Sequence, residues 1–405
     1  MSALIGTSAF SEEWLLATLR ASDPEFSAVS GVKSVEEISG GKGFCSKVYL
    51  CDVGASAVVL KVPECGKLNE VCAPEEEEAA DKEAVPDIVL SHNRECQFYD
   101  DFGHLNLITL PKMFKTGKFE SKKPGFLLME SLAGVGALDE LVSGFNKHQL
   151  LAMARDIGRF QAHFLRREER SWVQRFDKSL GAKIMPVIVG LFDKLKSMNE
   201  DLFAEGVDRM KADLGNPDFY NHVAFHAYRK AGVPPVLVHG NLWTNNIFWK
   251  LNADGSVSNE VAAYIDWQLT HSGARSLPDF PSLISSHSCI TSDLASILVI
   301  CTEADVRRQY TDQVLKEYYS TLTEELHGEV PFTFDQVEEM FKVNFINQCW
   351  NLMFAVVFQP AMCATLSAPV RAAQLVQFSN RAKLAIDDCL PHFENLFKEF
   401  ANLTI

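Results

Sequence analysis

Two side chains that carry oxygen donors, Asn246 and Asp266, stand where the sequence predicts the two open ends of a β-hairpin. Residues 247–249 read as a short strand and residues 261–265 as its return strand, with an Asp-Gly dipeptide between them that favours a tight turn. Closing this hairpin brings Asn246 and Asp266 to the same end. An amide oxygen and a carboxylate together form a hard-oxygen pair suited to Mg²⁺ carried by a nucleotide.

The alternative is that both residues serve the backbone, because Asn and Asp are common as turn residues and caps at strand ends. For either residue alone, this structural role is the more frequent one. The segment before the hairpin makes a chemical role of the two residues more frequent than a structural one. In this segment, apolar residues 236–238 lead into a polar elbow at His239-Gly240. The elbow, the hairpin and the pair of oxygen donors together favour a chemical role.

These segments resemble the catalytic segment of a known family. Residues 239–246 read His-Gly-Asn-Leu-Trp-Thr-Asn-Asn and residues 265–268 read Ile-Asp-Trp-Gln. The ecdysteroid kinase-like family, also called choline-kinase-like (CHK), has His-Gly-Asp, variable positions around a Trp, then Asn, and later Asp-Trp-Gln. That family belongs with the aminoglycoside phosphotransferases in the protein-kinase-like fold. The chain departs from the pattern at one position, because Asn241 stands where the family has its catalytic aspartate.

A glycine-rich segment and a strand lysine lie upstream in the order that this resemblance implies. The segment contains Gly41, Gly43 and Ser46, and such loops allow the backbone to approach phosphates closely. Lys61 stands inside the apolar strand expected at residues 57–63. From the residues alone, an ordinary hairpin and a solvated edge-strand lysine remain open. The resemblance implies that these residues bind the phosphates of ATP.

Further site residues are implied only by the resemblance. Glu95, in a helical segment, would pair with the strand lysine, although an ordinary surface glutamate is the alternative. Met129, Glu130 and Leu132 end a buried strand where the family has the hinge that binds adenine through its backbone. Asp279 resembles the family's downstream aspartate, which braces the catalytic loop. With Asn246 and Asp266 as metal-binding residues, the cofactors implied are ATP and Mg²⁺.

The catalytic positions implied by the resemblance are Asn241 and His239. Asn241 cannot accept a proton as a carboxylate does, and a positioned base contributes ~10²–10⁴ in rate. It can still orient a hydroxyl group through its amide oxygen. Three interpretations follow: a slow kinase or one whose base comes from elsewhere, a nucleotide- or metabolite-binding pseudokinase, and an interaction scaffold. The partners expected are a nucleotide and a small-molecule hydroxyl acceptor that the sequence does not identify.

Composition limits the functional class. The chain has 405 residues, 47% hydrophobic and 22% charged, with a net charge of −15, which argues against a general nucleic-acid binder. Its ten cysteines contain no Cys-x-x-Cys spacing, so reduced thiols in the cytoplasm are expected. Glu12 and Glu13 interrupt the first segment, which excludes a signal peptide pattern. The apolar residues 349–366 include Pro360 and are expected as a buried helix, without a membrane span.

The predicted fold is α+β and bilobal, like a protein kinase. The N-lobe, residues 1–131, should contain an antiparallel sheet, one helix capped by Ser11, the phosphate loop and the Glu95 helix. The C-lobe, residues 132–405, should be larger and mainly helical, with the catalytic loop, the metal site and the acceptor region. Helical patterns are expected near residues 150–164, 187–202 and 220–230, and a capping box at Thr333–Gln336 begins another helix.

Overall fold

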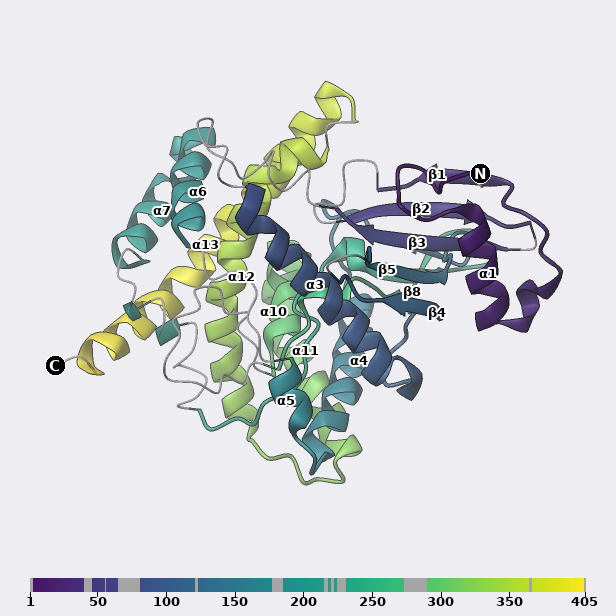
Figure 1. Cartoon of the computed structure of the whole chain (residues 1–405). Coiled ribbons are helices and arrows are strands. Elements are labelled where there is room, and N and C mark those ends of the chain that lie inside the picture. The colour runs from purple at the N-terminus through teal and green to yellow at the C-terminus, as the bar shows by residue number, and fades with distance from the viewer. Residues whose placement is uncertain are drawn as a thin grey trace. The chain divides into compact units, whose positions relative to one another are not determined.

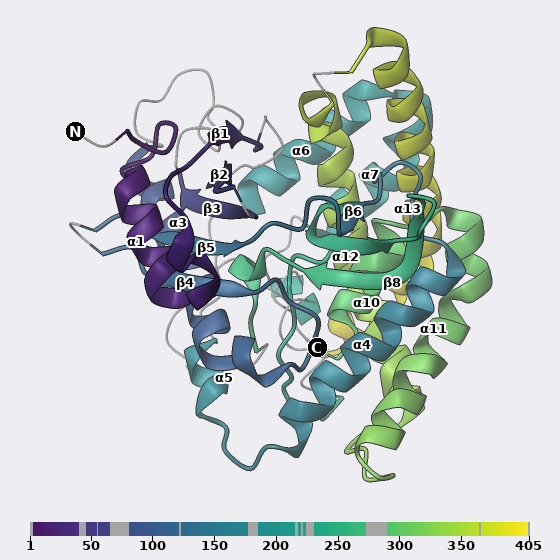
Figure 2. The ribbon, with the colours of Figure 1, turned by 90° about the vertical axis from the view of Figure 1, so that its right-hand side faces the viewer.

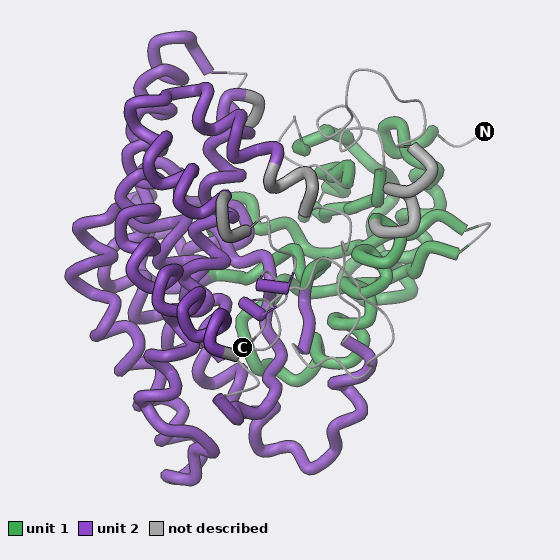
Figure 3. The backbone as a smooth tube through the Cα atoms, turned by 90° about the vertical axis from the view of Figure 1, so that its left-hand side faces the viewer, with its two compact units in different colours: residues 1–137, 262–269 green, residues 138–261, 270–405 purple. Residues whose placement is uncertain are grey.

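The computed structural model describes residues 3–39, 46–54, 56–64, 81–120, 123–176, 185–214, 218–219, 222–223, 231–272, 290–363 and 366–403. The chain forms two compact units (Figure 3). Unit 1 contains Met1–Ala137 together with Ala262–Leu269, and unit 2 contains Leu138–Val261 and Thr270–Ile405. A single division after residue 131 therefore differs from the observed units chiefly at Ala262–Leu269, which returns to unit 1.

Unit 1 is built on a five-stranded antiparallel sheet with strand order β1-β2-β3-β5-β4 (Figure 1). The strands are β1 Ser34–Glu37, β2 Ser46–Asp52, β3 Ala57–Pro63, β4 Met113–Gly117 and β5 Phe126–Glu130. The antiparallel sheet predicted for the N-terminal part is confirmed, and the expected strand at 57–63 has the observed bounds of β3. Its β-branched and leucine residues suit a strand buried on one face.

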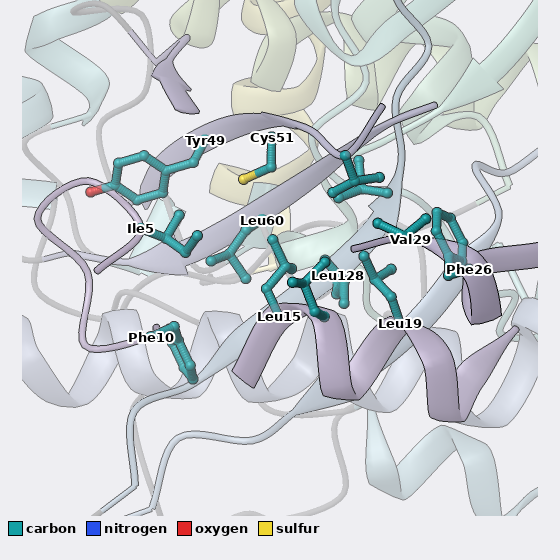
Figure 4. Close-up of a cluster of buried hydrophobic side chains, with 13 residues drawn as sticks. Ile5, Phe10, Leu15, Leu19, Phe26, Val29, Tyr49, Cys51, Leu60 and Leu128 are labelled. Carbon is teal, nitrogen blue, oxygen red and sulfur yellow. The ribbon is translucent and has the colours of Figure 1, made fainter. Parts of the chain in front are cut away.

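One face of this sheet packs against helix α1, Glu12–Ser22, and the short helix η1, Pro24–Ala28 (Figure 4). Val58 and Leu60 from β3 and Leu15 and Leu19 from α1 share this apolar core, and all four are fully buried. Ser11 caps α1, because its hydroxyl accepts a hydrogen bond from the backbone N–H three residues later. The predicted cap and inward-facing leucines are thus observed.

The opposite face of β3 carries Lys61, since alternate residues of a strand point to opposite sides. Helix α3, Asp81–Phe102, supplies Glu95 to this face. The helix is longer than the sequence indicated at 92–99. Helix η5, Trp267–Leu269, also packs against α3. It belongs to the segment Ala262–Leu269, which is part of unit 1 although it is distant in sequence.

Unit 2 is mainly helical, as predicted (Figure 2). Its longer helices are α4 Lys147–Arg166, α6 Met185–Met198, α7 Glu200–Leu214, α10 Ser292–Val299, α11 Ala304–Glu325, α12 Phe334–Met362 and α13 Ala368–Leu403, and α5 is Ser171–Arg175. Helix α4 packs against α11, α10 against α12, and α12 against α13. Thr333 and Gln336 form the expected capping box, with reciprocal side-chain to backbone bonds of 2.7 and 3.3 Å. The helix expected at 220–230 lies largely outside the described residues.

The predicted hairpin is formed by β7, Ile247–Leu251, and β8, Val257–Tyr264, which belong to a three-stranded sheet with β6, Gly136–Leu138. The Asp-Gly turn has Gly255 at φ +84°, a conformation that glycine adopts without steric cost. Helix α12 contains most of the apolar segment 349–366. Among the described helices, none is long and apolar enough to cross a bilayer.

Candidate functional site

Lys61 is the centre of a buried charged cluster inside unit 1. Its ammonium Nζ donates to Glu95 Oε2 at 2.7 Å and also to Asp266 Oδ1. Lys61 is 9% exposed and Glu95 is 1% exposed, so the pair is shielded from solvent. Three residues from distant parts of the sequence therefore meet at one nitrogen atom. The expected Lys61–Glu95 contact is observed.

The cluster holds two carboxylates and one ammonium group. Burial alone would lower the pKa of Lys61, but the charges of Asp266 and Glu95 outweigh it and raise that pKa above its ordinary value. Burial raises the pKa of Glu95 to about 7, since Lys61 offsets only part of the desolvation and Asp266 adds a like charge. Lys61 thus stays charged although it is buried.

Asp266 is fixed by its neighbours in the Asp-Trp-Gln segment. Its backbone adopts φ +66°, a left-handed conformation that is uncommon for a residue other than glycine. Gln268 Nε2 donates to the second carboxylate oxygen, Oδ2, at 3.1 Å. Trp267 stacks on Phe98 of α3 with ring centroids 3.8 Å apart and planes 6° from parallel. The aromatic stack therefore anchors the segment that carries Asp266 to the helix that carries Glu95.

The elbow at residues 239–242 is held by a buried carboxylate in unit 2. The backbone N–H groups of His239 and Gly240 donate to the two oxygens of Asp293 at 2.8 and 3.0 Å. Asp293 lies in the first turn of α10 and is 3% exposed. Burial raises its pKa to about 6, although the two N–H donors act in the opposite direction. Gly240 adopts φ +75°, which allows the chain to turn sharply at this point.

Hydrogen bonds within the elbow hold the backbone of Asn241. Its N–H donates to ring nitrogen Nδ1 of His239 at 3.2 Å, and its carbonyl accepts from Asn246 Nδ2 at 2.7 Å. His239 is 2% exposed, and acceptance at Nδ1 places the proton of the neutral ring on Nε2. Ser296 of α10 donates to the carbonyl of Leu242 at 2.7 Å. His239 and Asn246 therefore position the backbone of Asn241.

The other predicted site residues are distributed over the sheet of unit 1. Ser46 begins β2, whereas Gly41 and Gly43 lie outside the described residues. Met129 is buried near the end of β5, and Leu132 follows this strand. Glu130 pairs across the strands with Val58, so its side chain lies on the sheet face opposite Lys61. The side chain of Glu130 therefore cannot contact a ligand on the face that carries Lys61, and only its backbone could do so.

Asp293 is the residue that sequence reasoning missed. The bracing role was expected of Asp279, which lies outside the described residues, and the structure gives Asp293 the two bonds to the elbow. A signal existed in the sequence: Ser292-Asp293 opens a strongly apolar helix, where an acid in the first turn is typical. Among the described residues, no group of three or more His, Cys, Asp or Glu side chains is arranged to hold a metal ion.

Comparison with known protein families assigns the chain to one of them. The model of the family DUF1679, described as "Uncharacterized oxidoreductase dhs-27", matches residues 25–390. The chain belongs to this family. A curated relative, the uncharacterized oxidoreductase dhs-27 of Caenorhabditis elegans, is 22% identical over 311 residues, which cover 74% of the chain. The match spans only 36% of the length of dhs-27.

A second relative and a solved structure connect this DUF1679 member with kinases. The uncharacterized kinase-like protein D1044.1 of Caenorhabditis elegans is 22% identical over 330 residues, which cover 78% of the chain and 80% of that protein. Choline kinase from Cryptosporidium parvum aligns over 96% of both chains with a TM-score of 0.55 and 11% identity. The chain therefore has the fold of choline kinase, and the kinase-like resemblance drawn from its motifs is confirmed.

Proposed function

We propose that this protein binds ATP with Mg²⁺ and transfers a phosphoryl group slowly to a hydroxyl group of a small molecule. The observation that carries the proposal is the buried cluster of Lys61, Glu95 and Asp266 in unit 1. Phosphoryl transfer requires a protein chiefly to hold phosphates and to neutralise their charge. A lysine that stays charged although buried, and that is held in place by a glutamate, meets this requirement.

The donor set supports Mg²⁺ that arrives with a nucleotide. Mg²⁺ in such sites takes one or two protein oxygens and completes its shell with phosphates and water. Asp266 offers a carboxylate whose oxygens accept from Lys61 Nζ and Gln268 Nε2. Asn246, the second oxygen donor predicted from the sequence, lies in unit 2, where its Nδ2 donates to the carbonyl of Asn241. When bound, the metal would neutralise charge on the transferring phosphoryl group.

The nucleotide base and phosphates are assigned to unit 1. The backbone at Met129–Leu132 would bond to adenine, whereas the glycine-rich segment that contains Gly41 and Gly43, predicted from the sequence to bind phosphates, lies outside the described residues. Lys61 would contact the phosphates from β3, with Glu95 fixing its direction. The fold shared with choline kinase supports this proposal.

Asn241 defines what the proposed reaction lacks. The proton of an attacking hydroxyl must leave as the new oxygen–phosphorus bond forms, and an amide does not accept it. Asn241 would therefore orient the hydroxyl without acting as a base, and transfer would be slow. The same residue favours a second candidate, a pseudokinase that binds nucleotide without turnover.

Nucleotide binding is the first test. At one hundred times Kd, ATP with Mg²⁺ should stabilise the folded chain by ~2.7 kcal/mol, which a thermal-denaturation scan detects. Asp266→Asn should weaken this effect for ATP with Mg²⁺. The matched surface variant Glu120→Gln should retain it, because Glu120 is exposed and forms an ion pair with exposed Lys123. Absence of any shift at millimolar nucleotide would reject both candidates. Phosphate release or transfer then separates the kinase from the pseudokinase.

A further inference from the structure

Unit 1 contains a pocket on the sheet face opposite the Lys61 cluster. Its volume is about 360 Å³, within the range of small-molecule sites. The pocket lies at the end of the sheet where β3 begins and β5 ends, beneath η1. Glu130 lines it, and this side chain is on the sheet face opposite Lys61 because Glu130 is the cross-strand neighbour of Val58. The pocket is therefore separate from the Lys61 cluster.

Two aromatic rings form the apolar wall of this pocket. Phe26 of η1 and Phe114 of β4 meet edge to face, with ring centroids 5.2 Å apart and planes at 88°. Phe26 is 3% exposed and belongs to the core beneath α1 (Figure 4), so the wall is rigidly supported. Aromatic faces attract organic cations through the ring quadrupole as well as apolar groups.

Carboxylates outnumber ammonium groups around the pocket. Its lysine, Lys112, forms an ion pair with Asp23, and its ammonium group makes a cation–π contact with Phe114, 5.6 Å from the ring centre. The charges of Glu25 and Glu130 also act on this ammonium group, so three carboxylates share one cation. The carboxylates of Glu25 and Glu130 also line the pocket. Within the described part of the chain neither of them forms an ion pair, and Glu130 uses one oxygen, Oε1, to accept from the backbone N–H of Lys112 at 2.7 Å. The local charge is therefore negative.

A hydroxyl group adds a directional contact. Ser56, in the turn before β3, lines the pocket, and its Oγ is buried with no hydrogen-bond partner among the residues that the structure describes. A buried hydroxyl without a partner is costly, and a ligand with a donor group would satisfy it. We propose that this pocket binds a small organic cation, an amine with an apolar body, between the aromatic wall and the carboxylates of Glu25 and Glu130.

Ligand-observed NMR on the full chain tests the charge and shape of the ligand. The probes are benzylamine, which is a cation at pH 7, and two analogues of similar size, neutral benzyl alcohol and anionic benzoate. Benzylamine should bind at millimolar concentration, benzyl alcohol more weakly, and benzoate least. Equal or stronger binding of benzoate would overturn the proposal, because it would show that the negative charge of the pocket does not select the ligand.

Two substitutions of opposite sign locate the probe. Glu130→Gln keeps the acceptor for the Lys112 N–H but removes a charge, and should weaken benzylamine binding by about fivefold, the effect of opposite unit charges 4 Å apart in water. Lys112→Met leaves Asp23 uncompensated and should strengthen binding by a similar factor. The matched control is Asp266→Asn, which makes the same carboxylate-to-amide change on the other face and should leave benzylamine binding unchanged.

The outcomes separate the pocket from the nucleotide site. Loss of benzylamine binding in Asp266→Asn, with no change in Glu130→Gln, would place the amine at the Lys61 cluster and refute the assignment. Each variant is first checked by its melting temperature, and Glu25→Gln, an exposed position, provides a second charge removal if Glu130→Gln is unstable. Because these probes carry no phosphate, the result does not depend on whether the chain binds ATP.

Discussion

Replacing Lys61 by methionine isolates the charge that holds the buried cluster together. The variant keeps a side chain of similar length but leaves Glu95 and Asp266 without their shared ammonium group. Removing one partner of a buried ion pair typically costs ~3–5 kcal/mol, because the remaining charge is uncompensated. For a unit of this size, each kcal/mol lowers the melting temperature by ~2–4 °C. A decrease on the order of 10 °C is therefore expected at pH 7.5.

The decisive comparison is with Lys61→Met combined with Glu95→Gln. The amide occupies the volume of the carboxyl group and needs no compensating charge, so most of the lost stability should return. Glu95→Gln alone should cost little, since burial already raises the pKa of Glu95 to about 7 and charging it is costly. The double-mutant cycle is measured by thermal or urea denaturation without nucleotide. If the double variant is no more stable than Lys61→Met, the lysine does not compensate these carboxylates and the electrostatic account is wrong.

Three further predictions concern the elbow. Asn241→Asp should raise ATP hydrolysis by ~10-fold or more, about 1.4 kcal/mol of barrier, and a folded, nucleotide-binding variant with unchanged hydrolysis would favour the pseudokinase. The pKa of Asp293 is raised from 3.8 to about 6 in the folded chain. Its contribution to the free energy of unfolding is therefore fully present below pH 3.8 and is lost as pH rises through 6. The stability gap between the native chain and Asp293→Asn should accordingly change by ~3 kcal/mol between pH 4 and 7, in favour of the variant at higher pH, and a constant gap in melting temperature would contradict the shift. Gly240→Ala should destabilise the chain by ~1–2 kcal/mol in urea denaturation, because φ is +75° there.

Local sequence signals predicted the parts of the fold whose cause is local. The Ser11 cap, the Thr333–Gln336 capping box and the Asp-Gly turn each depend on residues within a few positions of one another, and each is observed. The strand with Lys61 was also bounded correctly, because its apolar run ends at a proline. These features required no knowledge of the tertiary structure.

The site was only partly predictable for a physical reason. The contact of Lys61 with Glu95 followed from a family resemblance, and nothing in their local sequence requires it. Asp293 was missed because its function depends on two backbone N–H groups more than fifty positions away, whose direction is set by the fold. The stack of Trp267 on Phe98 is likewise a tertiary contact between residues far apart in sequence.

The return of Ala262–Leu269 to unit 1 has a consequence for the order of folding during synthesis (Figure 3). Domains generally fold as units, beginning with the N-terminal one, while the ribosome is still adding residues. Here the first 137 residues contain Lys61, Glu95 and Phe98 but lack Asp266 and Trp267, so the charged cluster and the aromatic stack cannot close when that segment emerges. The nascent chain must hold an incomplete unit 1 until much of unit 2 has been translated. Completion of the Lys61 cluster is therefore a late event in synthesis, although Lys61 itself is made early.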